Sequence, residues 1–97
     1  MDRDRVFALL AAELPKLRTA FGVAELAVFG SVARGEATPT SDVDVLVRFE
    51  GPATFDGFMG LKLALEDLLG VKVDLVTQQA LKPRMRAAIL EEARRVA

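Results

Sequence analysis

The chain has 97 residues, 52% of them hydrophobic and 28% charged, and its formal net charge is −1. These values fit one small globular domain and exclude a global basic field that would attract nucleic acid or an anionic membrane. The absence of cysteine and histidine excludes disulfides, Cys/His zinc sites and the nucleophilic or acid–base mechanisms that need those side chains. Any chemistry must therefore rest on carboxylates, hydroxyls, backbone amides and cations, and carboxylate-held Mg²⁺ is the leading expectation.

The N-terminus carries alternating charges and lacks the basic region and the small-residue cleavage site of a signal peptide. No apolar run approaches the roughly 20 residues that span a bilayer. We therefore expect a soluble, cytoplasmic protein with no membrane partner.

The first third of the chain predicts a helix followed by a strand. Apolar residues recur at three- and four-residue steps over 2–20, which predicts an amphipathic helix that Pro15 bends or divides. Gly22 stands where a left-handed helix stop is expected. Residues 25–29 form a short β-rich run, and the Gly-, Ser- and Thr-rich residues 30–41 predict a loop with one helical turn.

The remainder predicts two more strands and two more helices. Residues 42–49 alternate between apolar and polar, which is typical of a strand with one buried face. An apolar face predicts a helix over 54–69, and a third strand follows at 71–77. Pro83 suits the first turn of a last helix, whose phase is set by Met85, Ile89, Glu92/Ala93 and Val96.

The element order αβ(loop)βαβα predicts an α/β (α+β) fold in a single domain, 1–97. The helix between strands two and three allows a parallel crossover, whereas strands one and two are expected to be antiparallel neighbours. We therefore expect a three-stranded mixed sheet with helices packed on one face.

Three aspartates are the candidate metal ligands. Asp42 and Asp44 lie two residues apart on one strand and therefore project from the same face. Asp74 lies on the polar face of the next strand. Grouped carboxylates repel one another unless a cation lies among them, and hard oxygen ligands suit Mg²⁺ or Mn²⁺. Alternatively, Asp42 begins a strand and the other two are solvated.

A second feature, Gly30-Ser31, follows the first strand directly. A glycine at such a turn lets backbone amides approach an anion, Ser31 adds a hydroxyl donor, and Arg34 can reach a phosphate. An ordinary turn with a serine cap, and an Arg34 that pairs with Glu36, remain the alternatives.

The two features together form a known pattern. The pattern is GS-x10-DxD plus a third Asp. Ten residues separate Gly30-Ser31 from Asp42, one residue separates Asp42 from Asp44, and Asp74 lies on a later strand. This sequence resembles the nucleotidyltransferase superfamily that includes DNA polymerase beta. The wider string GSVARGEATPTSDVDVLVRFE is similar to the minimal nucleotidyltransferase (MNT) domains of prokaryotes, and the resemblance extends from about Leu26 to Ala93.

The resemblance implies roles for individual residues. Asp42, Asp44 and Asp74 would be the catalytic residues and would hold two Mg²⁺ ions, or Mn²⁺, with Asp74 also helping the acceptor hydroxyl to lose its proton. Gly30 and Ser31 would bind the β- and γ-phosphates of ATP or another NTP, and Arg34 matches a triplet frequent at this place.

The resemblance also implies a biological setting. MNT domains are commonly encoded beside a HEPN-domain toxin, onto which characterised members transfer AMP (AMPylation). We therefore expect a nucleotidyltransferase of the protein adenylyltransferase kind that acts as an antitoxin in a hetero-oligomer, with no DNA or RNA binding. The alternative is a catalytically weak or inactive subunit that neutralises a HEPN ribonuclease by complex formation. Transfer to a small molecule or to RNA ends is a third, less favoured interpretation.

Two features do not fit the pattern directly. Arg48 lies on the face that bears the aspartates, where it is expected to pair with Glu50 or a helix carboxylate. Residues 79–97 carry five positive and two negative side chains, so the last helix is basic. Its basic face is either a partner surface, a phosphate contact or simply solvated.

Overall fold

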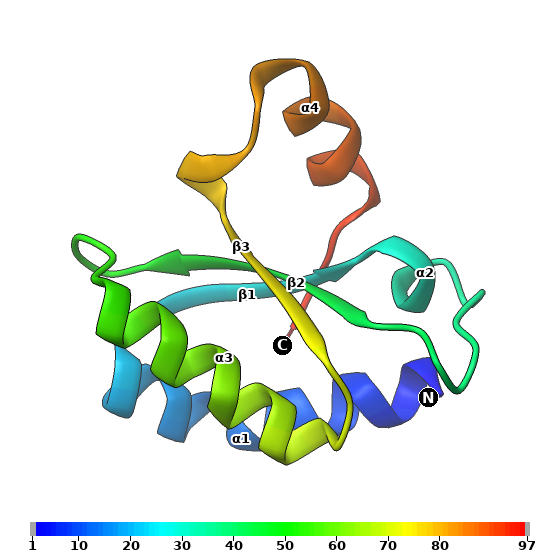
Figure 1. The fold of residues 1–97 in the computed structure, drawn as a ribbon, viewed down its shortest axis with the longest axis horizontal. Coiled ribbons are helices and arrows are strands. Elements are labelled where there is room, and N and C mark those ends of the chain that lie inside the picture. The colour runs from blue at the N-terminus through cyan, green and yellow to red at the C-terminus, as the bar shows by residue number, and fades with distance from the viewer. Residues whose placement is uncertain (1, 97) are drawn as a thin grey trace.

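The computed structural model describes residues 2–96 and contains a four-stranded sheet with helices. In chain order the elements are α1 (Arg3–Phe21), β1 (Val23–Phe29), α2 (Gly30–Ala33), β2 (Val43–Phe49), α3 (Phe55–Leu69), β3 (Val73–Thr77), the 3₁₀ helix η1 (Gln78–Ala80), α4 (Pro83–Glu92) and β4 (Arg94–Arg95). Figure 1 shows their arrangement. The α/β fold predicted from the sequence is confirmed.

The strand order is β3-β2-β1-β4. β1 and β2 pair in antiparallel orientation, and β2 and β3 pair in parallel orientation across the α3 crossover. Both relations were predicted from the element order. The predicted number of strands was wrong, because β4 adds a fourth strand that pairs antiparallel with β1.

Arg94 and Arg95 form a strand rather than the end of a helix. α4 ends at Glu92, and Ala93 is already extended, with φ −61 and ψ 138. The Val96 amide then donates to the Leu26 carbonyl at 2.8 Å, and the Val96 side chain is buried in the main core. The prediction that the helix continues to Val96 was therefore wrong, because this valine reaches the core as part of the sheet edge.

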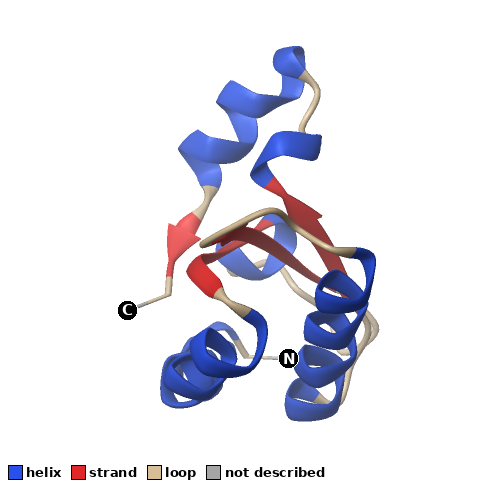
Figure 2. Ribbon diagram, turned by 90° about the vertical axis from the view of Figure 1, so that its left-hand side faces the viewer, coloured by secondary structure: helices blue, strands red, loops and turns tan. Residues whose placement is uncertain are grey.

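α1 and α3 lie side by side against one face of the sheet, as Figures 1 and 2 show from two directions. The inward residues of β2 are fully buried between the strands and these helices: Val43, Val45 and Val47, each with 0% of its surface exposed. α4 lies beyond the opposite face and contains no buried residue. The expectation that the helices pack on one face thus holds for α1 and α3 but not for α4.

The glycine stops lie where the sequence placed them, and of the two effects expected of Pro15 the division of the helix was wrong. Gly22 ends α1 with φ 70 and Gly70 ends α3 with φ 72, both left-handed conformations that favour glycine. Pro15 does not divide α1, which runs unbroken around it. Pro15 lies on the exposed side of the helix, where its carbonyl accepts a hydrogen bond from the Thr19 hydroxyl at 3.1 Å.

No helix within residues 2–96 combines the length and the apolar character that crossing a bilayer requires.

The core packing yields a matched test on α3. Leu65 is 0% exposed in the core, whereas Leu63 is 58% exposed on the same helix. Leu65→Ala is expected to lower the free energy of unfolding by about 3 kcal/mol, since it removes buried methylene groups and leaves a cavity. Leu63→Ala is expected to change it by less than about 0.5 kcal/mol. Urea denaturation measures both, and similar losses for the two variants would contradict the described packing.

Candidate functional site

The candidate site is built around Asp44, the second residue of β2. In the sheet register Asp44 pairs with Phe29 of β1 on one side and with Asp74 of β3 on the other. Because Gly30 follows Phe29 directly, the register brings the Gly30-Ser31 turn beside Asp44. The structure therefore brings together two motifs that the sequence separates by ten residues.

Gly30 contacts the Asp44 side chain so closely that only glycine fits. A Cβ built on Gly30 would overlap Asp44 Oδ2 and lie 2.9 Å from its Cγ. Gly30 also has φ 72, a left-handed conformation that L side chains rarely adopt. The glycine thus lets the turn pass directly over the carboxylate.

Asp42 and Asp74 flank Asp44 and are both exposed. Asp42 follows a tight turn in which the Thr38 amide donates to the Ser41 hydroxyl at 2.9 Å and the Ser41 amide donates to the Thr38 carbonyl at 3.0 Å. This turn fixes where the loop enters β2. Asp74 lies on the neighbouring parallel strand, roughly 4.8 Å from β2 in the hydrogen-bonding direction.

The electrostatics of the site centre on the half-buried Asp44. Burial raises the pKa of the Asp44 carboxyl, and the charges of Asp74 and Asp42 raise it further. Arg34 acts in the opposite direction, whereas Glu92 adds to the repulsion. The site therefore concentrates negative charge that the protein itself only partly compensates.

The residues present suit a hard divalent cation. Within residues 2–96, no three His, Cys, Asp or Glu side chains lie in an arrangement ready to hold a metal ion. The donor set around Asp44 nevertheless consists of carboxylate oxygens, which Mg²⁺ and Mn²⁺ prefer. Burial first, and then repulsion from Asp74 and Asp42, raise the pKa of the Asp44 carboxyl, and a bound cation would relieve that repulsion.

Arg34 makes two ion pairs beside the Gly30 turn. Its Nε donates to Glu36 Oε1 at 2.6 Å, which the sequence offered as an alternative, and its Nη1 donates to Glu92 Oε1 at 2.7 Å. Both carboxylates, with hydrogen bonding to Glu36 the largest cause, raise the pKa of the Arg34 guanidinium. The guanidinium is about half exposed, and its positive charge acts to lower the pKa of the Asp44 carboxyl.

Glu92 is the site residue that sequence reasoning missed. Its Oε1 also accepts a hydrogen bond from the Gly30 amide at 2.5 Å. The sequence pattern indicated only that Glu92 helps to set the phase of the last helix. The two residues are 62 positions apart, and no local pattern connects them.

Arg48 pairs with a partner that the sequence did not suggest. Its Nη2 lies 3.3 Å from Glu25 Oε1, so the expected partners, Glu50 or a helix carboxylate, were wrong. Glu25 lies directly opposite Arg48 in the β1–β2 register. Cross-strand pairing therefore decided the contact.

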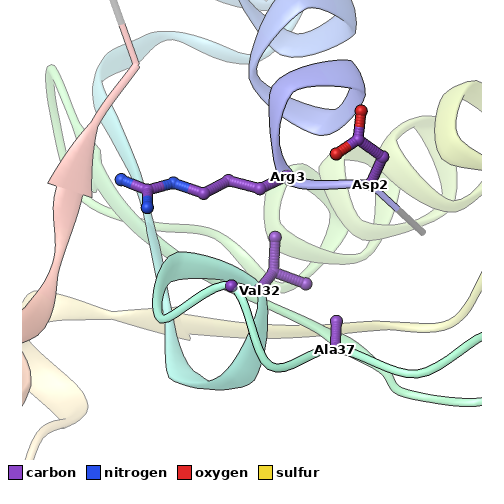
Figure 3. Close-up of a pocket in the computed structure, with 5 residues that line it drawn as sticks. Asp2, Arg3, Val32 and Ala37 are labelled. Carbon is purple, nitrogen blue, oxygen red and sulfur yellow. The ribbon is translucent and has the colours of Figure 1, made fainter.

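A cavity of about 190 Å³ borders α2 (Figure 3). Asp2 and Arg3 line it from the start of α1, and Val32 and Ala37 point toward them from α2 and the loop that follows. None of the aspartates of the site lines this cavity, nor do the predicted phosphate-binding residues. The acidic site lies instead around Asp44, at the start of the interior strand β2.

Comparison with known proteins adds independent evidence. The family model described as "Nucleotidyltransferase domain" matches residues 13–96. The chain is 44% identical over 89 residues to the "Protein adenylyltransferase MntA" of Thermococcus cleftensis, which covers 92% of this chain and 90% of that protein.

Solved structures agree with the fold. A structure assigned to the minimal nucleotidyltransferases is 46% identical with a TM-score of 0.83, over 97% of this chain and 95% of that one. An MNT antitoxin complex with the tri-AMPylated HEPN toxin of Shewanella oneidensis matches with a TM-score of 0.67, over 94% of this chain and 71% of that one. At 17% identity this second match shows the fold alone. The family model, together with the MntA relative and the 46% identical structure, establishes that the chain belongs to the nucleotidyltransferase domain family.

Proposed function

We propose that this nucleotidyltransferase transfers AMP from ATP onto a hydroxyl group of a HEPN-domain toxin, requires Mg²⁺, and thereby acts as an antitoxin. The observation that carries the proposal is the contact of the Gly30 turn with Asp44, which in turn pairs with Asp74. This contact joins phosphate-binding donors to a set of carboxylates. The acceptor and the nucleotide are suggested by the similarity to MntA and by the AMPylated toxin in the structural relative.

The turn after β1 offers the groups that a triphosphate needs. The Gly30 amide and the Ser31 hydroxyl are hydrogen-bond donors, and the Arg34 guanidinium can pair with phosphate oxygens in a bidentate manner. In our proposal these three residues bind the β- and γ-phosphates. Asp42, Asp44 and Asp74 then lie on the side where the α-phosphorus reacts.

The reaction is a displacement at the α-phosphorus of ATP. The acceptor hydroxyl oxygen forms a bond to phosphorus, the bond to the β-phosphate oxygen breaks, and the products are an AMP ester and pyrophosphate. Asp42, Asp44 and Asp74 would hold Mg²⁺, which when bound supplies charge neutralisation for the entering and leaving oxygens. Asp74, an exposed carboxylate on the strand beside Asp44, would help to remove the proton of the acceptor hydroxyl.

A second function is favoured by the exposure of α4. Its ten residues include none that is buried, and Met85 and Leu90 are 49% and 44% exposed. An isolated helix of this length is marginal in water, so a partner protein would stabilise it. Neutralisation of a HEPN toxin by complex formation is therefore compatible with the transfer reaction and with a hetero-oligomer.

The transfer reaction is tested with labelled ATP, Mg²⁺ and the product of the adjacent gene, if that product has a HEPN domain. Wild-type protein is expected to label the partner and release pyrophosphate. Asp44→Asn is expected to lower the rate by at least about 100-fold, because it removes one charge from the centre of the site. Asp67→Asn, a loss of one exposed charge on α3, is the matched control and is expected to retain activity.

Two results would decide between the functions. No label on the partner and no pyrophosphate, also when Mn²⁺ replaces Mg²⁺, would contradict the enzymatic proposal. Protection of cells by a triple variant with Ala at 42, 44 and 74 would show that complex formation suffices. Removal of the divalent ion with EDTA is expected to abolish labelling by the wild type.

The role of the close turn is tested with two glycines. Gly30 and Gly35 both have φ 72, but a Cβ on Gly35 has no neighbour within 4 Å. Both Ala variants are expected to lose about 1–2 kcal/mol of stability from the left-handed backbone. Only Gly30→Ala displaces Asp44, and it is expected to lower transfer by about 100-fold, since misplacement by an ångström has this effect. Equal activity of the two variants in the same assay would refute the proposed role of the contact.

A further inference from the structure

The Gly30 amide and the Arg34 guanidinium already hold a carboxylate. Glu92 Oε1 accepts hydrogen bonds from Gly30 N at 2.5 Å and from Arg34 Nη1 at 2.7 Å. These are two of the three donors that bind the nucleotide phosphates in the proposed function. A single backbone N–H cannot give a full hydrogen bond to Glu92 and to a phosphate at once.

We propose that Glu92 is a residue that determines nucleotide affinity: its carboxylate occupies the phosphate position on Gly30 and Arg34 and leaves when a triphosphate binds. The inference rests on the proposed function for the identity of the phosphate-binding groups. It concerns a competing anion supplied by the chain itself, and it is independent of whether transfer follows.

The surroundings of Glu92 allow it to leave. The residue is the last of α4, a helix that contains no buried residue, and its side chain is about one-third exposed. Displacing Glu92 therefore breaks no core packing. Arg34 keeps its second contact with Glu36 at 2.6 Å, so the guanidinium does not lose all its support when Glu92 departs.

The negative charge of Asp44 also favours the departure of Glu92. Glu92 and Asp44 repel each other across the site, so the carboxylate is held by Gly30 and Arg34 against that repulsion. A triphosphate offers several anionic oxygens to the same donors, and Arg34 can pair with two of them at once. A polyanion should therefore displace the single carboxylate, at the expense of part of its own affinity.

The competition is tested with inorganic tripolyphosphate in EDTA, which probes the anion site without metal, adenosine or acceptor. Titration calorimetry gives the affinity, and the Gly30 amide resonance reports which anion it binds. Glu92→Gln keeps a carbonyl acceptor for the turn but removes the charge. It is expected to bind tripolyphosphate about tenfold tighter than wild type, because a charge-assisted hydrogen bond is replaced by a weaker neutral one.

The controls separate competition from a loss of net charge and from a structural role. Glu91→Gln removes the same charge one residue away, on an exposed side chain, and is expected to bind like wild type. Glu92→Ala removes competitor and acceptor together and is expected to bind at least as tightly as Glu92→Gln if the turn keeps its shape. If Glu92→Ala does not fold, Glu92→Gln and the Gly30 resonance still decide the question.

Tighter binding in Glu92→Gln, together with a shift of the Gly30 amide on titration, supports the inference. Equal or weaker binding in a folded Glu92→Gln overturns it and makes Glu92 a residue that merely holds the turn. The outcome is distinct from that of the transfer assay. If the protein adenylylates no partner but Glu92→Gln binds tripolyphosphate more tightly than wild type, the inference stands. If the protein is active but Glu92→Gln binds tripolyphosphate no more tightly, the inference fails.

Discussion

The register of β2 between β1 and β3 is the constraint on which the rest of the structure depends. It aligns Asp44 with Phe29 on one side and with Asp74 on the other, and Gly30 follows at the end of β1. Successive residues of a strand point to opposite faces, so a slip of one residue would send Asp44 into the core and expose the valines beside it. The fully buried Val43 and Val45 make that slip costly. Core packing thus holds the carboxylate in place.

The same alternation separates the face of the sheet that packs in the core from the face that carries the candidate site. α1 and α3 cover the valine face, and the face that bears Asp44 is turned toward the side where α4 lies. No polar or charged side chain among the described residues is buried. The acidic site therefore adds little to the stability of the fold, and its negative charge is available to bind a cation.

Much of this arrangement could be predicted from the sequence because it depends on local periodicity. The alternation of 42–49 identified β2 and its faces, and the glycines at 22 and 70 marked the ends of two helices. The spacing of Gly30, Ser31 and the aspartates pointed to one site, and the family to which that spacing belongs is confirmed. The roles of those residues in catalysis are not tested by the fold and remain predictions.

What could not be predicted depends on contacts between distant parts of the chain. β4 consists of two exposed arginines with no alternation to reveal a strand, and only the edge of β1 makes it one. Arg48 meets Glu25 because the strands align them, which sequence neighbours such as Glu50 cannot show. Glu92 is the most instructive case, since the strand that follows it anchors Val96 to Leu26 and so fixes where the end of α4 lies. The short β4 thereby sets the position of the carboxylate on Gly30, and a two-residue strand at the edge of the sheet becomes a determinant of the site.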